Sequence, residues 1–513
     1  MENTPSLSPE AIDQCVRLLE SVVTDRLLLK QFTDEQRKAL LVAAGQVSRP
    51  DKLAQMKLAK QYRRDMKKKL RKEDRVARAK SGIRTAREQT VYLPPAEIAP
   101  SARQQQSTER LNHPRQCYVC KIRYEVLHFF YDSMCPRCGD LNYDKRFQTA
   151  PLHGQVALIT GARLKIGYQS ALKLLQAGAR VIVTTRFPRD AALRFAREPD
   201  CAQWKDRLEV HGLDLRHSPS VDLFCQLMEQ RLDRLDFLIN NAAQTVRRPP
   251  GFYSHLMEME RLPYDQLPPT AQDILAPLEQ FKRRLTRAPH TAIAQSPGHW
   301  LEVQEAAGPG IGIRESAALS MIPYHFDDLS HDREIFPEGK LDADLQQVDL
   351  RLRNTWRLKL GEVNTPEMLE VQLINAVAPF ILCGKLRGLM NRDRSRQRHV
   401  VNVSAMEGKF NRHTKTDKHP HTNMAKASLN MMTLTSAPDY AADGIYMNAV
   451  DTGWVTDEDP VHLSQSKQKE HDFHPPLDIV DGAARVLDPI FAGILTGRPV
   501  WGKFLKDYQP TSW

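Results

Sequence analysis

Four cysteines form the most regular pair of chemical motifs in this chain. Cys117 and Cys120 make a CYVC motif, and after fourteen residues Cys135 and Cys138 make a CPRCG motif. Two CxxC motifs at this separation are typical of the two knuckles that place four thiolates tetrahedrally around zinc. Because four thiolates leave no open coordination position, we expect a structural rather than a catalytic Zn²⁺. The alternative is two separate redox-active CxxC pairs.

A second group of residues has the spacing of a phosphate-binding turn. The apolar run 156–159 ends at Gly161, and Gly167 lies near the start of a segment with helical spacing of leucines. A strand, a glycine turn and a helix in this order offer backbone N–H groups to the pyrophosphate of a dinucleotide. The spacing alone is a weak signal, since Lys165 stands where a middle glycine is common, and the alternative is a tight structural turn.

Three later segments continue the alternation of buried strands and helices. Asp214 follows a third apolar strand, residues 235–243 read LDFLINNAA, and residues 400–404 read VVNVS. Asn375 lies in the helix that precedes the last of these. Strands that alternate with helices predict a parallel sheet covered by helices on both faces.

Taken in order, these motifs resemble the short-chain dehydrogenase/reductase superfamily. The family pattern is TGxxxGxG, D-[VL], NNAG, a helix asparagine, a strand-end serine, YxxxK and a PG turn. The resemblance covers about residues 153–243 and 366–513. It implies an α/β fold, a Rossmann-type doubly wound parallel sheet that binds a nicotinamide dinucleotide.

The end of the second strand predicts which dinucleotide is preferred. An acidic residue there would bind the ribose 2′-hydroxyl, but the sequence has Arg186. With Arg163 and Lys165, it offers positive charge to a 2′-phosphate, so we expect NADP(H) rather than NAD(H). The alternative for Arg186 is a solvated arginine at a strand end. The other positions that the resemblance assigns to the cofactor are Gly161, Ile166, Gly167, Asp214, Asn241, Ala242, Lys426 and Thr456.

The catalytic positions depart from the family pattern. The resemblance implies a tyrosine acid/base four residues before a lysine, a serine that polarises the substrate carbonyl, and an asparagine in a proton relay. Lys426 and Asn375 match the lysine and the asparagine, but Thr422 replaces the tyrosine and Ala405 replaces the serine. A threonine hydroxyl is a far poorer acid than a phenol, whose pKa is about 10.

Neighbouring residues are candidates for the missing groups. Ser404 precedes the serine position by one residue, although a slip of one residue in a strand turns the side chain to the opposite face. His421 adjoins the tyrosine position, and a histidine near its ordinary pKa is a competent proton donor. The other side chains that could reach the site are His413 and His419, which we interpret as polar loop residues, and Tyr253 and Tyr324.

The net charge of +11 is concentrated in one segment of the 513-residue chain. Residues 51–89 contain 15 Lys and Arg against 5 Asp and Glu, with few apolar residues. We expect a solvated helix or a partly disordered arm. Such an arm could bind nucleic acid or another polyanion, and the alternative is a helix that is merely exposed.

The chain therefore divides into a helical and then basic region (1–90), a Pro- and Gln-rich linker (91–115), a zinc ribbon (116–150) and a dinucleotide-binding domain (151–513). That domain carries an insertion at about 244–365, either a lid or a partner-binding surface. No apolar stretch approaches the roughly 18 residues of a membrane helix. The N-terminus lacks the features of a secretory signal, so we expect a cytoplasmic or nuclear protein.

Two functions stay open at this stage. The first is an NADP(H)-dependent oxidoreductase that transfers hydride to or from a small-molecule carbonyl or alcohol. In it Lys426 would orient the ribose, Asn375 would support the relay, and Ser404 or His421 would assist the oxygen. The second is a catalytically inactive relative whose ribbon and basic arm bind nucleic acid or a protein. Either form could be a homo-oligomer, as is frequent in the family.

Overall fold

The chain consists of two compact units, Met1–Asp74 and Arg75–Trp513. The computed structural model describes residues 8–99, 103, 109–287, 308–329, 334–411 and 415–513.

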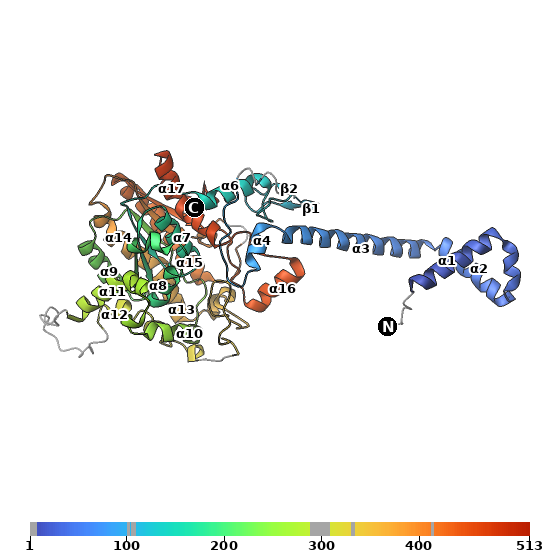
Figure 1. The fold of residues 1–513 in the computed structure, drawn as a ribbon, viewed down its shortest axis with the longest axis horizontal. Helices are drawn as coiled ribbons and strands as arrows, with labels where there is room; N and C mark the ends of the chain where they lie inside the picture. The colour runs from blue at the N-terminus through green and yellow to red at the C-terminus, as the bar shows by residue number, and fades with distance from the viewer. Residues whose placement is uncertain (1–7, 100–102, 104–108, 288–307, 330–333, 412–414) are drawn as a thin grey trace. The chain divides into compact units, whose positions relative to one another are not determined.

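The first unit is helical (Figure 1). Its helices are α1 (Pro9–Thr24), the 3-10 helix η1 (Arg26–Gln31), α2 (Asp34–Ser48) and the first part of α3 (Lys52–Ala79). Helix α2 starts with a capping box, in which Thr33 and Gln36 exchange side-chain and backbone hydrogen bonds. Most of the basic segment 51–89 forms one helix of 28 residues, α3, and a short second helix follows it.

An eight-stranded sheet lies at the centre of the second unit. Its order is β10-β9-β8-β7-β6-β3-β4-β5, and all neighbours are parallel except β9 and β10. This topology confirms the doubly wound α/β prediction. The strands are β3 (Val156–Thr160), β4 (Arg180–Thr185), β5 (Leu208–Gly212), β6 (Phe237–Asn240), β7 (Arg398–Ser404), β8 (Ile445–Asp451), β9 (Phe504–Lys506) and β10 (Gln509–Thr511).

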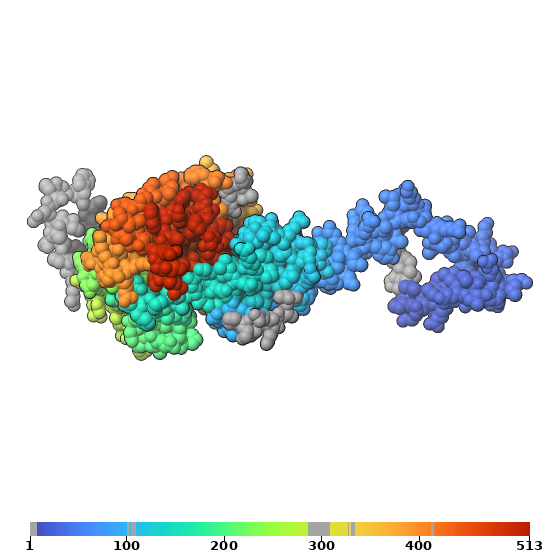
Figure 2. All heavy atoms as spheres, turned by 90° about the horizontal axis from the view of Figure 1, so that it is seen from above, coloured from blue at the N-terminus to red at the C-terminus, as the bar shows by residue number. Residues whose placement is uncertain are grey.

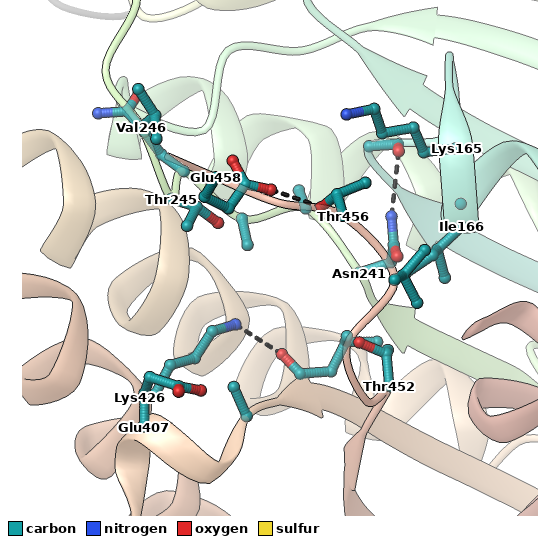
Figure 3. Close-up of a pocket in the computed structure, with 18 of the residues that line it drawn as sticks. Lys165, Ile166, Asn241, Thr245, Val246, Glu407, Lys426, Thr452, Thr456 and Glu458 are labelled. Atoms are coloured by element: carbon teal, nitrogen blue, oxygen red, sulfur yellow. Dashed lines mark hydrogen bonds between the residues drawn. The ribbon is translucent and has the colours of Figure 1, made fainter. Parts of the chain in front are cut away.

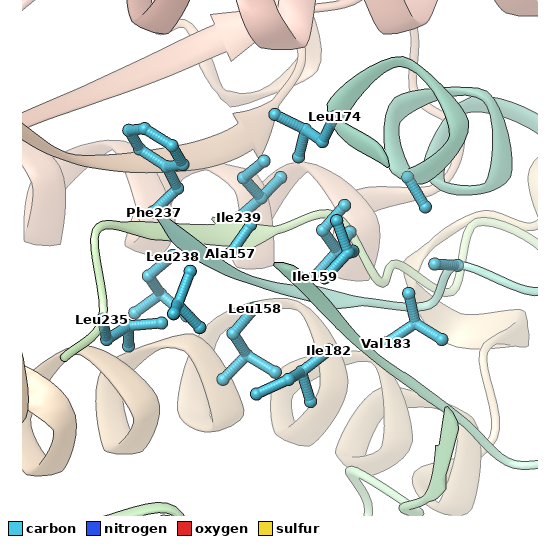
Figure 4. Packing of buried hydrophobic residues seen from close by; sticks show 14 of the residues in the cluster. Ala157, Leu158, Ile159, Leu174, Ile182, Val183, Leu235, Phe237, Leu238 and Ile239 are labelled. Carbon is cyan, nitrogen blue, oxygen red and sulfur yellow. The ribbon is translucent and has the colours of Figure 1, made fainter. Parts of the chain in front are cut away.

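The sheet is buried on both faces because its strands are apolar at successive positions. Leu158 pairs with Ile182 on one side and with Leu238 on the other, and all three side chains are buried. Figure 4 shows the next residues, such as Ile159, pointing to the opposite face, where Leu174 packs. The covering helices are α7 (Lys165–Gln176), α8 (Pro188–Ala196), α9 (Ser218–Arg231), α14 (Ala378–Met390), α15 (Pro420–Ala442) and α17 (Ile479–Thr496).

Helix α14 continues from α13 (Thr365–Gln372) through a π-helical turn, Leu373–Val377. Among the described residues, one segment, Thr365–Met390, is long and apolar enough to cross a membrane. Half of its apolar window is buried inside the protein, as it is in core helices. Short elements elsewhere are η2 (Cys201–Gln203), η3 (Lys205–Arg207), η12 (Met406–Gly408) and α16 (Val461–His471).

The insertion adds helices to the core as well as to the rim of the sheet. Helix α11 (Pro269–Arg287) buries Ile274, Leu278 and Phe281 in the same hydrophobic cluster as β5. Part of the insertion therefore belongs to the core of the sheet domain, since removing α11 would expose one edge of that core. Its other elements are α10 (Pro250–Arg261), η4 (Tyr264–Gln266), α12 (Ile311–Arg314), η7 (Ala318–Met321), η8 (Phe326–Leu329), η9 (Thr355–Arg357) and η10 (Leu360–Glu362).

The cysteine-containing segment packs on the C-terminal part of the sheet domain (Figure 2). We call residues 110–147 the cysteine ribbon. They contain β1 (Arg110–Gln116), β2 (Arg123–Val126) and α6 (Pro136–Phe147). Strand β1 begins within the range where we expected a linker, because its structure comes from antiparallel pairing with β2 rather than from its own composition. Helix α4 (Gly82–Arg87) also packs on this ribbon.

Candidate active site

A cavity of about 1170 Å³ lies at the carboxyl edge of the sheet. The residue after each of five strands lines it, namely Gly161, Arg186, Asn241, Ala405 and Thr452. The order of the strands reverses between β3 and β6, and open α/β sheets bind ligands at such a switch point. Figure 3 shows how side chains from these loops converge.

The turn after β3 requires glycine at its first position. Gly161 has φ of +69°, and an added Cβ would lie 2.8 Å from the Cα of Ala242. Asn241 supports the turn, since its Nδ2 donates to the carbonyl oxygen of Gly161 at 3.0 Å (Figure 3). Asn241 and Ala242 thus lie at the cavity beside the glycine turn.

Helix α7 begins at this turn and directs its first residues to the cavity. Lys165, Ile166 and Gly167 all line it. Lys165 adopts φ of +54° without being glycine, a conformation that costs on the order of 1 kcal/mol and is found mainly at functional sites. Its Nζ lies 3.7 Å from Asp344 of the insertion.

The two arginines expected near a 2′-phosphate differ in their partners. Arg186 donates to the hydroxyl of Tyr253 at 2.8 Å and to that of Ser320 at 3.2 Å, both uncharged. Arg163 forms an ion pair with Asp190 at 2.7 Å. Both line the cavity, and of these two arginines only Arg163 forms an ion pair with a carboxylate among the described residues. Arg186 is therefore better placed than Arg163 to meet an anionic ligand.

Asp214 and Thr456 line the cavity as well, each already held by a neighbour. Arg216 pairs with Asp214 at 2.6 Å. Burial alone would raise the pKa of the Asp214 carboxyl, but this guanidinium keeps it below its ordinary value. Thr456 donates to Glu458 at 2.6 Å (Figure 3).

Lys426 projects from α15 into the cavity beside Glu407 (Figure 3). Its ammonium donates to the carbonyl oxygen of Val403 at 2.7 Å. Burial lowers the pKa of Lys426 to about 8, against the opposing effect of the Glu407 and Asp451 carboxylates. An ammonium of this kind can bind ribose hydroxyls and still exchange its proton near neutral pH.

Asn375 acts on the cavity through one neighbour. It lies in the π-helical turn, and π-turns occur frequently at functional sites. Its Oδ1 accepts from the backbone N–H of Gln244 at 2.7 Å, and its Nδ2 donates to the carbonyl oxygen of Gln244 at 3.1 Å. Gln244 lines the cavity directly after the NNAA motif, so Asn375 fixes that loop.

Two of the expected catalytic side chains contact other residues, and a third, Thr422, is buried with no hydrogen-bond partner for its hydroxyl among the described residues. Ser404 lines the cavity, but its hydroxyl donates to Asn430 at 2.5 Å. His421 is buried against Glu367, with its Nε2 at 3.3 Å from the carboxylate. Thr422 is buried too, and neither His421 nor Thr422 is among the described residues that line the cavity.

His419, which we had interpreted as a polar loop residue, does precede helix α15, and it also lines the cavity. His419 is the N-cap residue of α15, and it lines the cavity together with Asn423 and Lys426 of that helix. His421 is on the other side of that helix. Helical spacing alone would not have identified His419, because Thr422, four residues before Lys426, falls on the same face by that spacing.

The surroundings of His419 hold its imidazole in place. The ring stacks on Trp356 with centroids 3.8 Å apart and planes at 4°. The backbone is left-handed, with φ of +41°, and its N–H donates to the carbonyl oxygen of Leu358 at 2.8 Å. Burial lowers the pKa of His419 and Glu407 opposes that effect. The cavity also includes Tyr253, whereas Tyr324 is 51% exposed and His413 lies outside the described residues.

The four cysteines of the ribbon form one cluster. Their sulfur atoms lie within 4.8 Å of one another, so they could hold a single metal ion. Sγ of Cys120 is 3.8 Å from Sγ of Cys135. Two thiolates bound to a tetrahedral zinc at about 2.3 Å are separated by about 3.8 Å, so this geometry fits zinc.

Known proteins resemble parts of this chain. Residues 155–260 match the family model described as short chain dehydrogenase. An uncharacterized protein of Acanthamoeba polyphaga mimivirus is 30% identical over 391 residues, which cover 74% of this chain and 71% of the viral protein. Retinol dehydrogenase 14 of Homo sapiens is 41% identical over 103 residues, 18% of this chain and 31% of its own length. This chain therefore matches less than a third of the human protein.

Among solved structures, the Pseudomonas aeruginosa RhlG/NADP active-site complex is 16% identical, with a TM-score of 0.40. The match covers 69% of this chain and 94% of that chain. A score this low supports no argument about the site.

Proposed function

The chain belongs to the short-chain dehydrogenase family, and from that premise we propose that it is an NADP(H)-dependent oxidoreductase. Its substrate would be a small molecule with a carbonyl or alcohol group. One observation carries the proposal: the glycine turn, Arg186 and Lys426 face a single cavity at the switch point of the sheet.

The residues present fit NADP(H) along the length of the cavity. Backbone N–H groups at the start of α7 would meet the pyrophosphate, and Arg186 would meet the 2′-phosphate. Lys426 would hold the nicotinamide ribose and Thr456 the carboxamide. When bound, the nicotinamide would supply the hydride chemistry.

For the proton we propose His419 in place of the missing tyrosine. It lines the cavity together with Lys426, whereas neither Thr422 nor His421 is among the described residues that line it, and His421 contacts Glu367. An imidazole can donate a proton to a carbonyl oxygen or accept one from an alcohol, and burial lowers the pKa of this one. Trp356 would fix its orientation by stacking.

The preference for NADPH should depend on Arg186. An Arg186→Ala variant is expected to bind NADPH at least about tenfold more weakly and NADH within about twofold of the unmodified protein, because a charge-assisted contact to phosphate is lost. Titration of the nicotinamide fluorescence measures both. Arg180→Ala is the matched control, since Arg180 begins the same strand and pairs with Glu209 away from the cavity. Tighter binding of NADH than NADPH by the unmodified protein would refute the assignment.

A second proposed function concerns helix α3, which would bind a nucleic acid or another polyanion. Residues 52–72 are almost all exposed, and their ten Lys and Arg side chains form no ion pair with described residues of the first unit. The available segment is shorter than the 51–89 expected from the sequence, because Arg84 is buried against Asp132 and Arg87 against backbone carbonyls.

Binding through α3 should depend strongly on salt. Each Lys that contacts a phosphate contributes about 0.9 to the slope of log K against log salt concentration for duplex DNA. Replacing Lys67, Lys68 and Lys69 with Gln is expected to lower that slope by up to about 2.7. Replacing Gln55 and Gln61 with Ala on the same helix should leave it unchanged. Fluorescence anisotropy with a labelled duplex measures the slope, and no binding at low salt would remove this proposal.

A further inference from the structure

The cysteine ribbon forms part of the cavity wall. Tyr118 and Lys121, at the first cysteine knuckle, both line the cavity. The hydroxyl oxygen of Tyr118 accepts a hydrogen bond from the backbone N–H of Trp454 at 3.0 Å, across 336 residues of sequence. Trp454 belongs to the loop 452–456, which follows β8 and ends at the position assigned to the carboxamide.

This loop has little room to move. Gly453 has φ of +77°, and a Cβ there would lie 2.4 Å from Leu477 and 3.1 Å from the Tyr118 hydroxyl. The carbonyl oxygen of Trp454 accepts from the backbone N–H of Leu477 at 3.3 Å. The loop is thus held between the ribbon on one side and the segment that leads into α17 on the other.

The ribbon contacts the two cofactor loops through one hydrophobic cluster. Buried ribbon residues such as Tyr131 share this cluster with Val455 of the 452–456 loop and with Leu477. Ile166, from the glycine turn, packs against the same cluster. A change in the packing of the ribbon core would therefore affect both the 452–456 loop and the glycine turn.

The ribbon is also fixed rigidly to α17. Arg146 of the ribbon, 1% exposed, pairs with Asp478 at 2.7 Å and with Asp481 at 2.9 Å, at the start of that helix. The Tyr131 hydroxyl donates to Asp481. Removing one member of a buried pair is strongly destabilising, so these contacts hold the ribbon in one position.

We propose that the metal held by the four cysteines keeps the cavity in its cofactor-binding shape, with Tyr118 as the positioning residue that links the two. Metal bound to Cys117 and Cys120 would fix the backbone on both sides of Tyr118, and Tyr118 would fix the loop 452–456. The ribbon is then part of the dinucleotide site rather than a separate module. This inference rests on the proposed binding of NADPH.

The test compares two tyrosine variants of the full-length, zinc-loaded protein. Tyr118→Phe removes the acceptor for Trp454, and Tyr124→Phe removes a hydrogen bond to Asp132 inside the same ribbon but outside the cavity. We expect NADPH binding about five- to tenfold weaker in Y118F and within about twofold in Y124F, as one hydrogen bond allows. Zinc content and thermal unfolding are measured for both.

Removal of zinc with a chelator gives the second readout. NADPH binding should weaken at least about tenfold and return when zinc is added back, while circular dichroism reports whether the sheet domain stays folded. Equal losses in Y118F and Y124F would overturn the inference, and so would unchanged NADPH affinity in folded, zinc-free protein. If the zinc-free protein unfolds, the comparison of Y118F with Y124F alone decides whether the inference holds. If the unmodified, zinc-loaded protein binds no NADPH, the proposed function itself fails.

Discussion

Replacing Lys426 with methionine is expected to abolish NADPH-dependent turnover while making the folded protein more stable at neutral pH. The loss follows from the place of Lys426 in the cavity, where its ammonium would bind the ribose. Methionine has a similar length and no charge, so it fills the same space without the donor. We expect turnover to fall at least about 100-fold and NADPH affinity at least about tenfold.

The gain in stability follows from the pKa of the same lysine. Burial lowers the pKa of Lys426 from 10.5 to about 8. Between these values the unfolded chain binds more protons than the folded chain, so stability rises with pH there. Below pH 8 both states are protonated, and the folded state carries the full cost of the buried charge, on the order of 3 kcal/mol. Methionine removes that cost, and loses the hydrogen bond to Val403 in return.

Denaturant unfolding at several pH values measures this effect. The unmodified protein should gain stability from pH 8 to pH 10 and K426M should not, so the difference between them should shrink as the pH rises. Lys409→Met is the matched control, because Lys409 is similarly buried but donates to Thr511 outside the cavity. A K426M protein that keeps both NADPH binding and turnover would contradict the assignment of the site.

The parts of the site that could be predicted from the sequence depend on local patterns. The strand and glycine turn at Gly161 and the CxxC pairs are each contained in a few consecutive residues, where spacing alone carries the chemistry. Lys426 and Asn375 could be placed because the resemblance supplied their positions. The contact between Tyr118 and Trp454 had no such signal, because it joins two segments 336 residues apart through tertiary packing.

The choice between His419 and His421 shows a second limit of prediction from the sequence. Adjacency to Thr422 favoured His421, yet side chains next to each other in a helix point about 100° apart. Whether His419 or His421 faces the cavity depends on where α15 begins, and Pro420 at its first position leaves His419 as the N-cap residue. The left-handed backbone of His419 then directs the ring toward Trp356, which comes from the insertion. Local helical spacing therefore limits which histidine could face the cavity, and tertiary contacts determine that it is His419.

Substitution of His419 should remove the chemical step and spare cofactor binding. We expect His419→Asn to lower turnover by about 100- to 10,000-fold, the usual range for loss of a general acid, with NADPH affinity within about twofold. Asparagine suits the test because it tolerates the left-handed backbone of this position, at φ of +41°. His421→Asn is the matched control, since His421 faces Glu367 instead. Loss of turnover in H421N with H419N fully active would reverse the assignment.

The pH dependence of the reaction rate, measured for carbonyl reduction and for alcohol oxidation, distinguishes a histidine that transfers a proton from one that is merely structural. Burial lowers the pKa of His419 below its ordinary 6.5. Carbonyl reduction needs the protonated imidazole, so its rate should fall as the pH rises through that pKa, whereas alcohol oxidation needs the neutral ring and should rise. Initial rates with a panel of aldehydes, ketones and alcohols between pH 5 and pH 8 test this. In H419N both limbs should flatten, because the group whose titration produces them is gone. Limbs that persist in H419N would assign the proton to another group of the cavity, such as Glu407, which lines it and acts on the pKa of His419.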